Sequence, residues 1–167
     1  EGRAEVVTDH IERFNDQGIQ LKSGKQLDAD IVILATGLNL KFAGGVRYSI
    51  DSKSIDFSQR FIYRGMMFSD VPNMAFTTGY TNSSWTLKAD LTGNYVCRLL
   101  NKMSRSGHKQ VMPRLHGRLN EMPLLDFDAG YVKRAIGQLP KQGDRLPWKN
   151  YQDYIRDFIS LRLGRLR

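Results

Sequence analysis

The chain has 167 residues, 41% of them hydrophobic and 25% charged, a composition that excludes disorder as the default and predicts one domain-sized core. The formal net charge of +8 would suit a nucleic-acid partner, but acidic residues stand between the basic ones and no nucleic-acid-binding motif accompanies them. We therefore expect no nucleic-acid partner.

Two further features bear on the compartment in which the protein works. The longest apolar run is far shorter than the ~20 residues of a membrane span, and the single cysteine, Cys97, cannot form a disulfide within the chain. Both features favour a cytoplasmic protein in which Cys97 is a buried, unreactive thiol. Residues 1–7 do not begin with methionine and resemble the end of a strand, so we expect a fragment of a longer protein.

The first part of the chain predicts a small antiparallel meander. Apolar and polar residues alternate at residues 11–14 and 18–27, and turn residues stand at 16–18 and 23–24. The continuous apolar run at residues 30–35 then predicts a strand that is buried on both faces.

The middle of the chain predicts a hairpin and then a strand that leads into a helix. Residues 48–50 and 54–57 flank a turn at residues 51–53. Residues 74–78 indicate a short buried strand, and Gly79 permits a sharp turn after it. Asn82, Ser83 and Ser84 are each suited to cap the helix that follows.

The helix is predicted from an apolar residue at every fourth position over about five turns. This face consists of Leu91, Tyr95, Leu99 and Met103, with Val96 and Leu100 beside it. Lys88 is expected to point into solvent, and residues 104–107 to end the helix. The free N–H groups and partial positive charge of the helix start attract phosphates, carboxylates and polarised carbonyl oxygens.

The remaining residues are interrupted by prolines and have room for one or two short helices. The strongest helical pattern is formed by apolar and aromatic residues near the end of the chain, namely Tyr151, Tyr154, Ile155, Phe158 and Leu161.

Several segments together resemble the C-terminal third of flavin-dependent Baeyer–Villiger monooxygenases, and within them the ethionamide-monooxygenase-like enzymes. Ala35-Thr36-Gly37 at the end of an apolar run is weak evidence alone, but four further matching segments follow it at matching intervals. The segments that carry the resemblance are residues 28–38, 63–67, 71–76 and 79–82, and it continues through residues 123–127, 130–135, 139–143 and 147–148.

The resemblance implies the fold class α/β. The chain would be an incomplete piece of a flavoprotein with two dinucleotide-binding domains, made of a small antiparallel meander, a strand–turn–helix unit and C-terminal helices. Residues 1–37 would end the NADP-binding domain, residues 38–104 would be the C-terminal part of the FAD-binding domain, and residues 105–167 would be a C-terminal helical extension.

The resemblance also implies two groups of cofactor-binding residues. One lies where the backbone passes close to the cofactors, and the other lies where a helix start stabilises negative charge on reduced flavin. Together they are Ala35, Thr36, Gly37, Gly79, Tyr80, Thr81, Asn82, Ser83, Ser84 and Trp85. An ordinary tight strand end fits the first group equally well, and an ordinary capped helix with Trp85 as a hydrophobic plug fits the side chains of the second.

A substrate pocket is implied at Tyr63, Met66 and Met67, whose adaptable side chains suit a lipophilic ketone or thio-compound. Packing in the core is the alternative for these three residues. FAD and NADPH would be the cofactors of the full-length enzyme. No catalytic residue and no metal ligand is assigned in this chain.

The glycine-rich dinucleotide motifs of the family lie upstream of the matching region, and no Gly-x-Gly-x-x-Gly occurs here. We therefore expect the isolated fragment to be inactive, to bind neither cofactor tightly, and to self-associate through surface that the missing N-terminal FAD/NADP portion would cover. The alternative is a non-catalytic basic binding or assembly module derived from such an enzyme.

Overall fold

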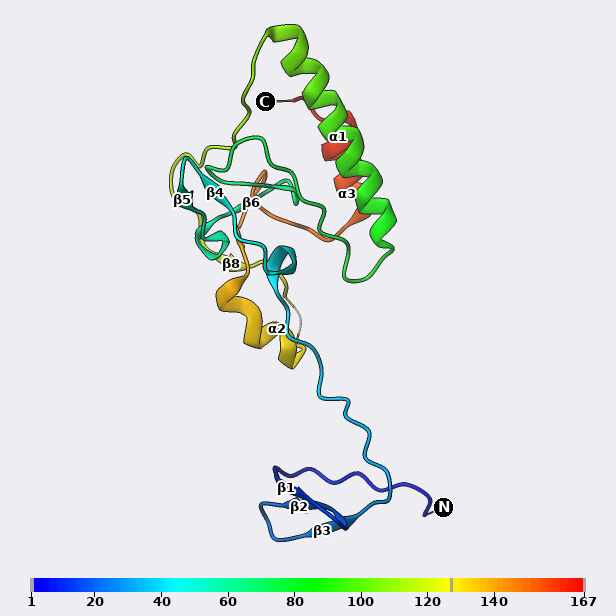
Figure 1. Ribbon diagram of the computed structural model, residues 1–167. Helices are drawn as coiled ribbons and strands as arrows, with labels where there is room; N and C mark the ends of the chain where they lie inside the picture. The colour runs from blue at the N-terminus through cyan, green and yellow to red at the C-terminus, as the bar shows by residue number, and fades with distance from the viewer. Residues whose placement is uncertain (1, 127, 167) are drawn as a thin grey trace. The chain divides into compact units, whose positions relative to one another are not determined.

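The computed structural model describes residues 2–126 and 128–166. It contains two compact units, Glu1–Gly37 and Leu38–Arg167, and each is described by itself (Figure 1). The division coincides with the first predicted domain boundary, but the assignment of the units to NADP- and FAD-binding domains stays a prediction. Residues 1, 127 and 167 lie outside the described part of the chain. Within that part, no helix has the length and hydrophobicity that crossing a membrane requires.

The first unit is a three-stranded antiparallel sheet of β1 (Ile11–Asn15), β2 (Gly18–Leu21) and β3 (Gln26–Asp28), in the order β1-β2-β3. Asn15 pairs with Gly18 across a two-residue turn. Gly18 has a φ of 138°, and a Cβ there would lie 2.2 Å from the carbonyl oxygen of Leu27. The predicted meander is therefore confirmed, and its first turn requires glycine.

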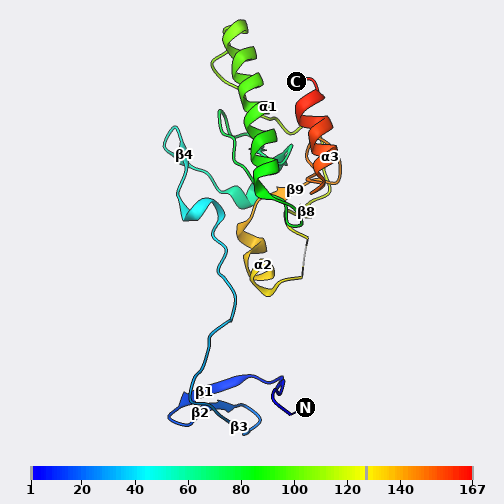
Figure 2. The ribbon, with the colours of Figure 1, turned by 90° about the vertical axis from the view of Figure 1, so that its right-hand side faces the viewer.

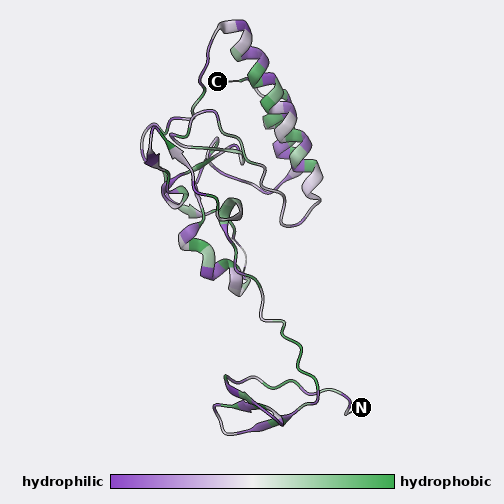
Figure 3. Cartoon of the chain, viewed as in Figure 1, coloured by the Kyte–Doolittle hydropathy of each residue, from purple (hydrophilic) through white to green (hydrophobic). Residues whose placement is uncertain are grey.

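The strand predicted at residues 30–35 is wrong. This segment has no regular structure, and Ile31, Ile33 and Leu34 are exposed. A strand that is buried on both faces needs a neighbouring strand on each side, because its N–H and C=O groups have no partners within the strand itself. Figure 3 shows the segment after β3 in the colours of hydrophobic residues.

The second unit begins with short elements. A turn of 3₁₀ helix, η1 (Phe42–Gly45), precedes the hairpin of β4 (Ser49–Ile50) and β5 (Lys53–Ser54), as predicted for this region. Another 3₁₀ turn, η2 (Phe57–Gln59), follows. A second hairpin pairs β6 (Ile62–Tyr63) with β7 (Met67–Phe68).

One long helix dominates the second unit. Helix α1 (Trp85–Ser106) ends at Gly107, whose φ of 71° satisfies the last turn with a left-handed cap. Both views show it beside the C-terminal helical segment, which consists of the single turn α3 (Tyr154–Asp157) and the π-helical η4 (Phe158–Leu163) (Figures 1 and 2). The predicted helix and its end at residues 104–107 are confirmed.

The chain between these helices forms β8 (Met122–Pro123), α2 (Gly130–Ala135), the 3₁₀ turn η3 (Ile136–Gln138) and β9 (Lys141–Gln142). Strands β8 and β9 pair antiparallel. Next to β9, Phe61 and Lys141 form a single parallel bridge, which attaches this part to the chain before β6.

The β6–β7 hairpin separates two hydrophobic clusters. Its residues Ile62 and Phe68 belong to one cluster, together with Phe57, Val71 and Leu124. Met66 and Met67 belong to the other, which α1 and η4 complete with Leu91, Tyr95, Leu99 and Leu161. Because neighbouring strand residues point to opposite faces, one two-stranded ribbon contributes to both clusters.

Some expectations about strands and buried side chains fail in this unit. Residues 74–78 form no strand, and Leu100 and Cys97 are exposed on the outer side of α1. Leu100 follows the buried Leu99 on α1, and its side chain is exposed. The coarse prediction holds: the chain is a small α/β piece with short antiparallel strands and a few helices.

Candidate functional site

The start of α1 leaves its backbone donors free. Ser84 is the N-cap residue, but its side chain does not cap the helix, because its Oγ lies 2.7 Å from Thr86 Oγ1 in a hydrogen bond between the two hydroxyls. The first turn contains no acidic residue. In the part of the chain that the structure describes, no acceptor bonds the N–H of Ser83, Ser84 or Trp85. The predicted cap position is confirmed at Ser84, whereas the predicted side-chain capping bond is absent.

The turn that precedes α1 is covered by an indole. Trp85 is 66% exposed, so it does not fill the core as a hydrophobic plug would. Its ring instead lies against Gly79, where a Cβ would come within 2.1 Å of the indole Cδ2. Gly79 is buried beneath this ring. Glycine is needed here for the close approach, not for a positive φ.

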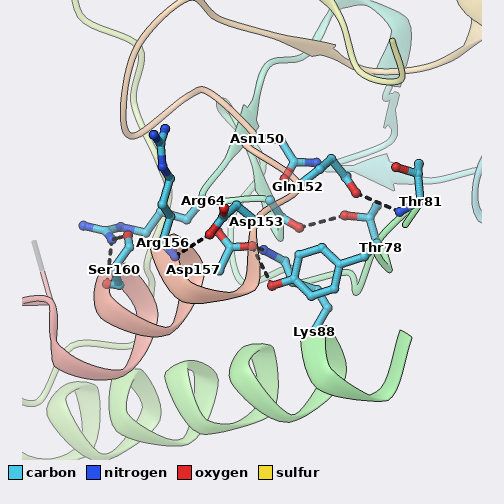
Figure 4. A network of polar contacts seen from close by, with 12 residues as sticks. Arg64, Thr78, Thr81, Lys88, Asn150, Gln152, Asp153, Arg156, Asp157 and Ser160 are labelled. Carbon is cyan, nitrogen blue, oxygen red and sulfur yellow. Dashed lines mark hydrogen bonds and ion pairs between the residues drawn. The ribbon is translucent and has the colours of Figure 1, made fainter. Parts of the chain in front are cut away.

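A polar network joins this turn to the C-terminal segment (Figure 4). Lys88 Nζ lies 2.6 Å from Asp157 Oδ2, and the Tyr80 hydroxyl donates to the same oxygen over 2.8 Å. The N–H of Thr81 donates to Gln152 Oε1. Lys88 is only 1% exposed. The expectation of a solvated lysine is therefore wrong, and an acidic partner 69 residues later in the sequence is the reason.

Burial raises the pKa of Tyr80, and its hydrogen bond to the Asp157 carboxylate raises that pKa further. Tyr80 is thus held neutral, as a donor to that carboxylate. Burial also raises the pKa of Tyr95 to about 12, and the neighbouring Tyr63 acts in the same direction. Both phenols are therefore neutral hydrogen-bonding groups at physiological pH.

The predicted substrate residues divide between a core and a cavity. Met66 is fully buried in the cluster beneath α1. Tyr63 and Met67 line an open cavity of about 450 Å³ whose other walls are Tyr95, Leu99, Val111, Met112, Pro113, Arg114 and His116. The Tyr63 ring also packs edge-to-face on Trp148, with the ring centroids 5.3 Å apart.

Two hydrogen bonds bring the hairpin loop and the stretch before α1 together. Thr78 Oγ1 donates to the carbonyl oxygen of Gly65 over 3.0 Å, and the N–H of Phe76 donates to the carbonyl oxygen of Met66 over 2.7 Å. The predicted flavin-binding and substrate-binding segments of the second unit are thus neighbours. The remaining predicted cofactor residues, 35–37, are exposed members of the first unit.

The chain has well-matched relatives among known proteins. The FAD-containing monooxygenase EthA of Mycobacterium tuberculosis is 51% identical over 166 residues, which are 99% of this chain and 34% of that protein. EthA of Mycolicibacterium smegmatis is 45% identical over 99% of this chain and 34% of its own length. AlmA of an Acinetobacter species, named as an FAD-binding monooxygenase, is 49% identical over 97% of this chain and 33% of its own length. The chain is thus similar to a part of several FAD-containing or FAD-binding monooxygenases.

The resemblance predicted from the sequence is thereby confirmed. The chain spans about a third of the length of these relatives. No protein-family model matches it, and no solved structure matches it significantly.

The polar partners that fix the site are not visible in local residue patterns. Asp157, Gln152, Arg64 and Ser160 carry no local motif, and their partners lie 69 to 96 residues away in the sequence. The one available signal was the placement of Lys88 on the same helical face as Leu91 and Tyr95, three and seven residues later. That position predicts burial, and a buried lysine predicts an acidic partner.

Proposed function

We propose that this chain is the C-terminal part of an FAD- and NADPH-dependent monooxygenase that transfers one oxygen atom from O₂ to a lipophilic ketone or thio-compound. The observation that carries the proposal is the 51% identity to an FAD-containing monooxygenase over 99% of this chain. The alignment covers 99% of this chain, so it includes every segment in which we expect cofactor and substrate contacts.

The start of α1 fits one edge of a flavin. Its free and exposed N–H groups at residues 83–85 and the absence of a first-turn carboxylate suit an acceptor that becomes negatively charged. Bound FAD would take electrons from NADPH and activate O₂, which no side chain can do. The residues of this chain would hold and orient the flavin, and the helix dipole would stabilise negative charge on it.

The backbone of residues 35–37 fits a close approach to a dinucleotide. Gly37 has a φ of 90°, a conformation that residues with a side chain rarely adopt, and Ala35 and Thr36 are small. We infer that these residues form the crossing from an NADP-binding to an FAD-binding domain in the full-length protein.

The cavity at Tyr63 and Met67 supports a lipophilic substrate. Most of its wall is aliphatic or aromatic, and the polar side chains of Arg114 and His116 are exposed members of the lining. We assign Met66 to the core instead of the pocket, because it is fully buried and does not line the cavity.

The test is made on the full-length protein. We expect it to purify with bound FAD, to oxidise NADPH faster when a lipophilic ketone or thioether is added, and to form the oxygenated product. A matched variant, Val111→Phe, fills part of the cavity and should raise KM for a bulky ketone more than for a small one. Absence of FAD, or NADPH oxidation that no ketone or thio-compound stimulates, would contradict the proposal.

A further inference from the structure

A buried ion pair lies one turn inside the helix whose start we assign to the flavin. Lys88 and Asp157 are joined at 2.6 Å, with their side chains 1% and 13% exposed, and they connect α1 to the end of α3 (Figure 4). A buried ammonium group is tolerated only when it is paired, because it has left its water of hydration. The pair therefore fixes α1 against the C-terminal segment at this level.

The same carboxylate also holds the turn in front of the helix. Asp157 Oδ2 accepts the Tyr80 hydroxyl hydrogen bond, and Gln152 Oε1 accepts the N–H of the next residue, Thr81. Tyr80 is only 2% exposed, so its phenol has few alternative positions. Two consecutive residues of the turn are thus tied to one short stretch, residues 152–157.

The Lys88 side chain of the ion pair also lies close to the loop of the β6–β7 hairpin. A Cβ on Gly65 would lie 3.0 Å from Lys88 Nζ, and the φ of 69° at Gly65 disfavours other residues as well. The carbonyl oxygen of Gly65 accepts the Thr78 hydroxyl hydrogen bond. Lys88 and Asp157 therefore lie between the predicted flavin segment and the predicted substrate segment.

We propose that Asp157 and Lys88 are positioning residues of the flavin site: they hold residues 79–84 in the conformation that presents the start of α1 to the cofactor. This inference rests on the proposed function. Neither residue touches the flavin in this scheme. Asp157 acts through Tyr80, and Lys88 acts by keeping Asp157 in place.

The first measurement is hydrogen exchange in the flavin-free full-length protein. Asp157→Asn and the milder Tyr80→Phe should speed exchange in a peptide that covers residues 79–84, by about tenfold for Asp157→Asn. Leu161→Ala is the matched control, because Leu161 is 1% exposed in the same C-terminal segment and belongs to the hydrophobic cluster instead of the polar network. Unchanged exchange in both network variants would overturn the positioning role.

The second measurement is titration of the same flavin-free proteins with FAD. Asp157→Asn and Lys88→Met should raise the Kd for FAD about tenfold and shift the absorption bands of the bound flavin. Leu161→Ala should change neither the Kd for FAD nor the flavin bands, even if it lowers the thermal midpoint of the protein as much as the network variants do. Wild-type Kd and bands in both network variants would refute the inference. A wild-type protein that binds no FAD would contradict the proposed function, while the exchange result would still report on the network.

Discussion

Trp85 covers Gly79 so closely that a single methyl group has no room between them. A Cβ at position 79 would lie 2.1 to 2.5 Å from three atoms of the indole. Trp85 is nevertheless exposed, so its ring can rotate away when position 79 gains a side chain. The glycine therefore fixes where the indole lies, and the indole shields the turn before α1.

Gly79→Ala should displace the indole. We expect a red shift of Trp85 emission and a loss of about 1 kcal/mol in the free energy of unfolding, at the low end for overpacking because the ring is free to move. Fluorescence and denaturation of Gly79→Ala, Trp85→Phe and the double variant separate the displacement of the indole from the loss in the free energy of unfolding. An unshifted emission spectrum in Gly79→Ala would show that the ring does not lie on this glycine.

Ser84→Asp separates helix stability from flavin binding. An aspartate at the N-cap accepts a first-turn N–H and interacts favourably with the helix dipole, so the chain should gain about 0.5 to 1 kcal/mol. In the full-length protein the new carboxylate should repel reduced flavin and lower its midpoint potential. The control, Asn101→Asp, places the same charge on an exposed position almost five turns further along α1. Equal flavin midpoint potentials in Ser84→Asp and Asn101→Asp would contradict a position of the flavin beside the start of α1.

Arg64 ties the hairpin loop to the C-terminal segment. Its Nη1 donates to Ser160 Oγ over 2.6 Å and to the Ser160 carbonyl oxygen over 3.0 Å, and its guanidinium lies between the rings of Tyr63 and Tyr95. Arg64→Ala should cost about 1 to 3 kcal/mol of stability, and Ser160→Ala less, because the carbonyl acceptor stays. Denaturation of both single variants and the double variant tests the contact, since the two losses should not add. Strict additivity would mean that the two side chains do not interact.

Stability should fall in alkaline solution in part because of Tyr95, and Tyr80, whose pKa is raised as well, acts in the same direction. Burial raises the pKa of Tyr95 to about 12 in the folded state, whereas in the unfolded chain the pKa lies near the ordinary tyrosine value of 10.0. Between these two pKa values the unfolded chain loses the phenol proton while the folded chain keeps it. The contribution of Tyr95 to stability is therefore complete below about pH 10 and is lost as the pH rises to about 12. Tyr95→Phe should flatten this part of the stability curve. An equally steep curve in the variant would assign the loss to other groups.

Much of the fold follows from local patterns, whereas the strand predicted at residues 30–35 does not form. The turn at residues 16–18, the hairpin around residues 51–53 and the end of α1 at Gly107 are each encoded by a few neighbouring residues. Residues 30–35 carry an equally clear strand pattern, yet they are exposed coil because a strand pattern does not supply its hydrogen-bonding neighbours. Relatives three times as long offer a source for those neighbours.

The sequence predicts which stretch of backbone forms the candidate site, but not which polar side chains hold that stretch in place. The resemblance pointed to residues 79–85, and the structure adds that Lys88, Asp157 and Gln152 hold the front of this stretch. Pairing across about 70 residues leaves no periodic pattern in the sequence. Only the tertiary structure brings the partners together.

Cys97 offers a direct test of the outer face of α1. The thiol is exposed instead of buried as the helical pattern suggested, because it faces away from both clusters. The native chain should therefore react with a thiol reagent as fast as a small peptide thiol, and Cys97→Ser should abolish that reaction. Protection in the native chain, lost on unfolding, would indicate that another surface covers this face, as self-association of the fragment would do.

The central claim is that this chain forms one side of a flavin site, and the absorbance spectrum of the full-length purified protein tests it most directly. We predict a yellow protein with one FAD per chain whose flavin bands bleach when NADPH is added without oxygen. A colourless protein that takes up no FAD on titration would contradict the claim.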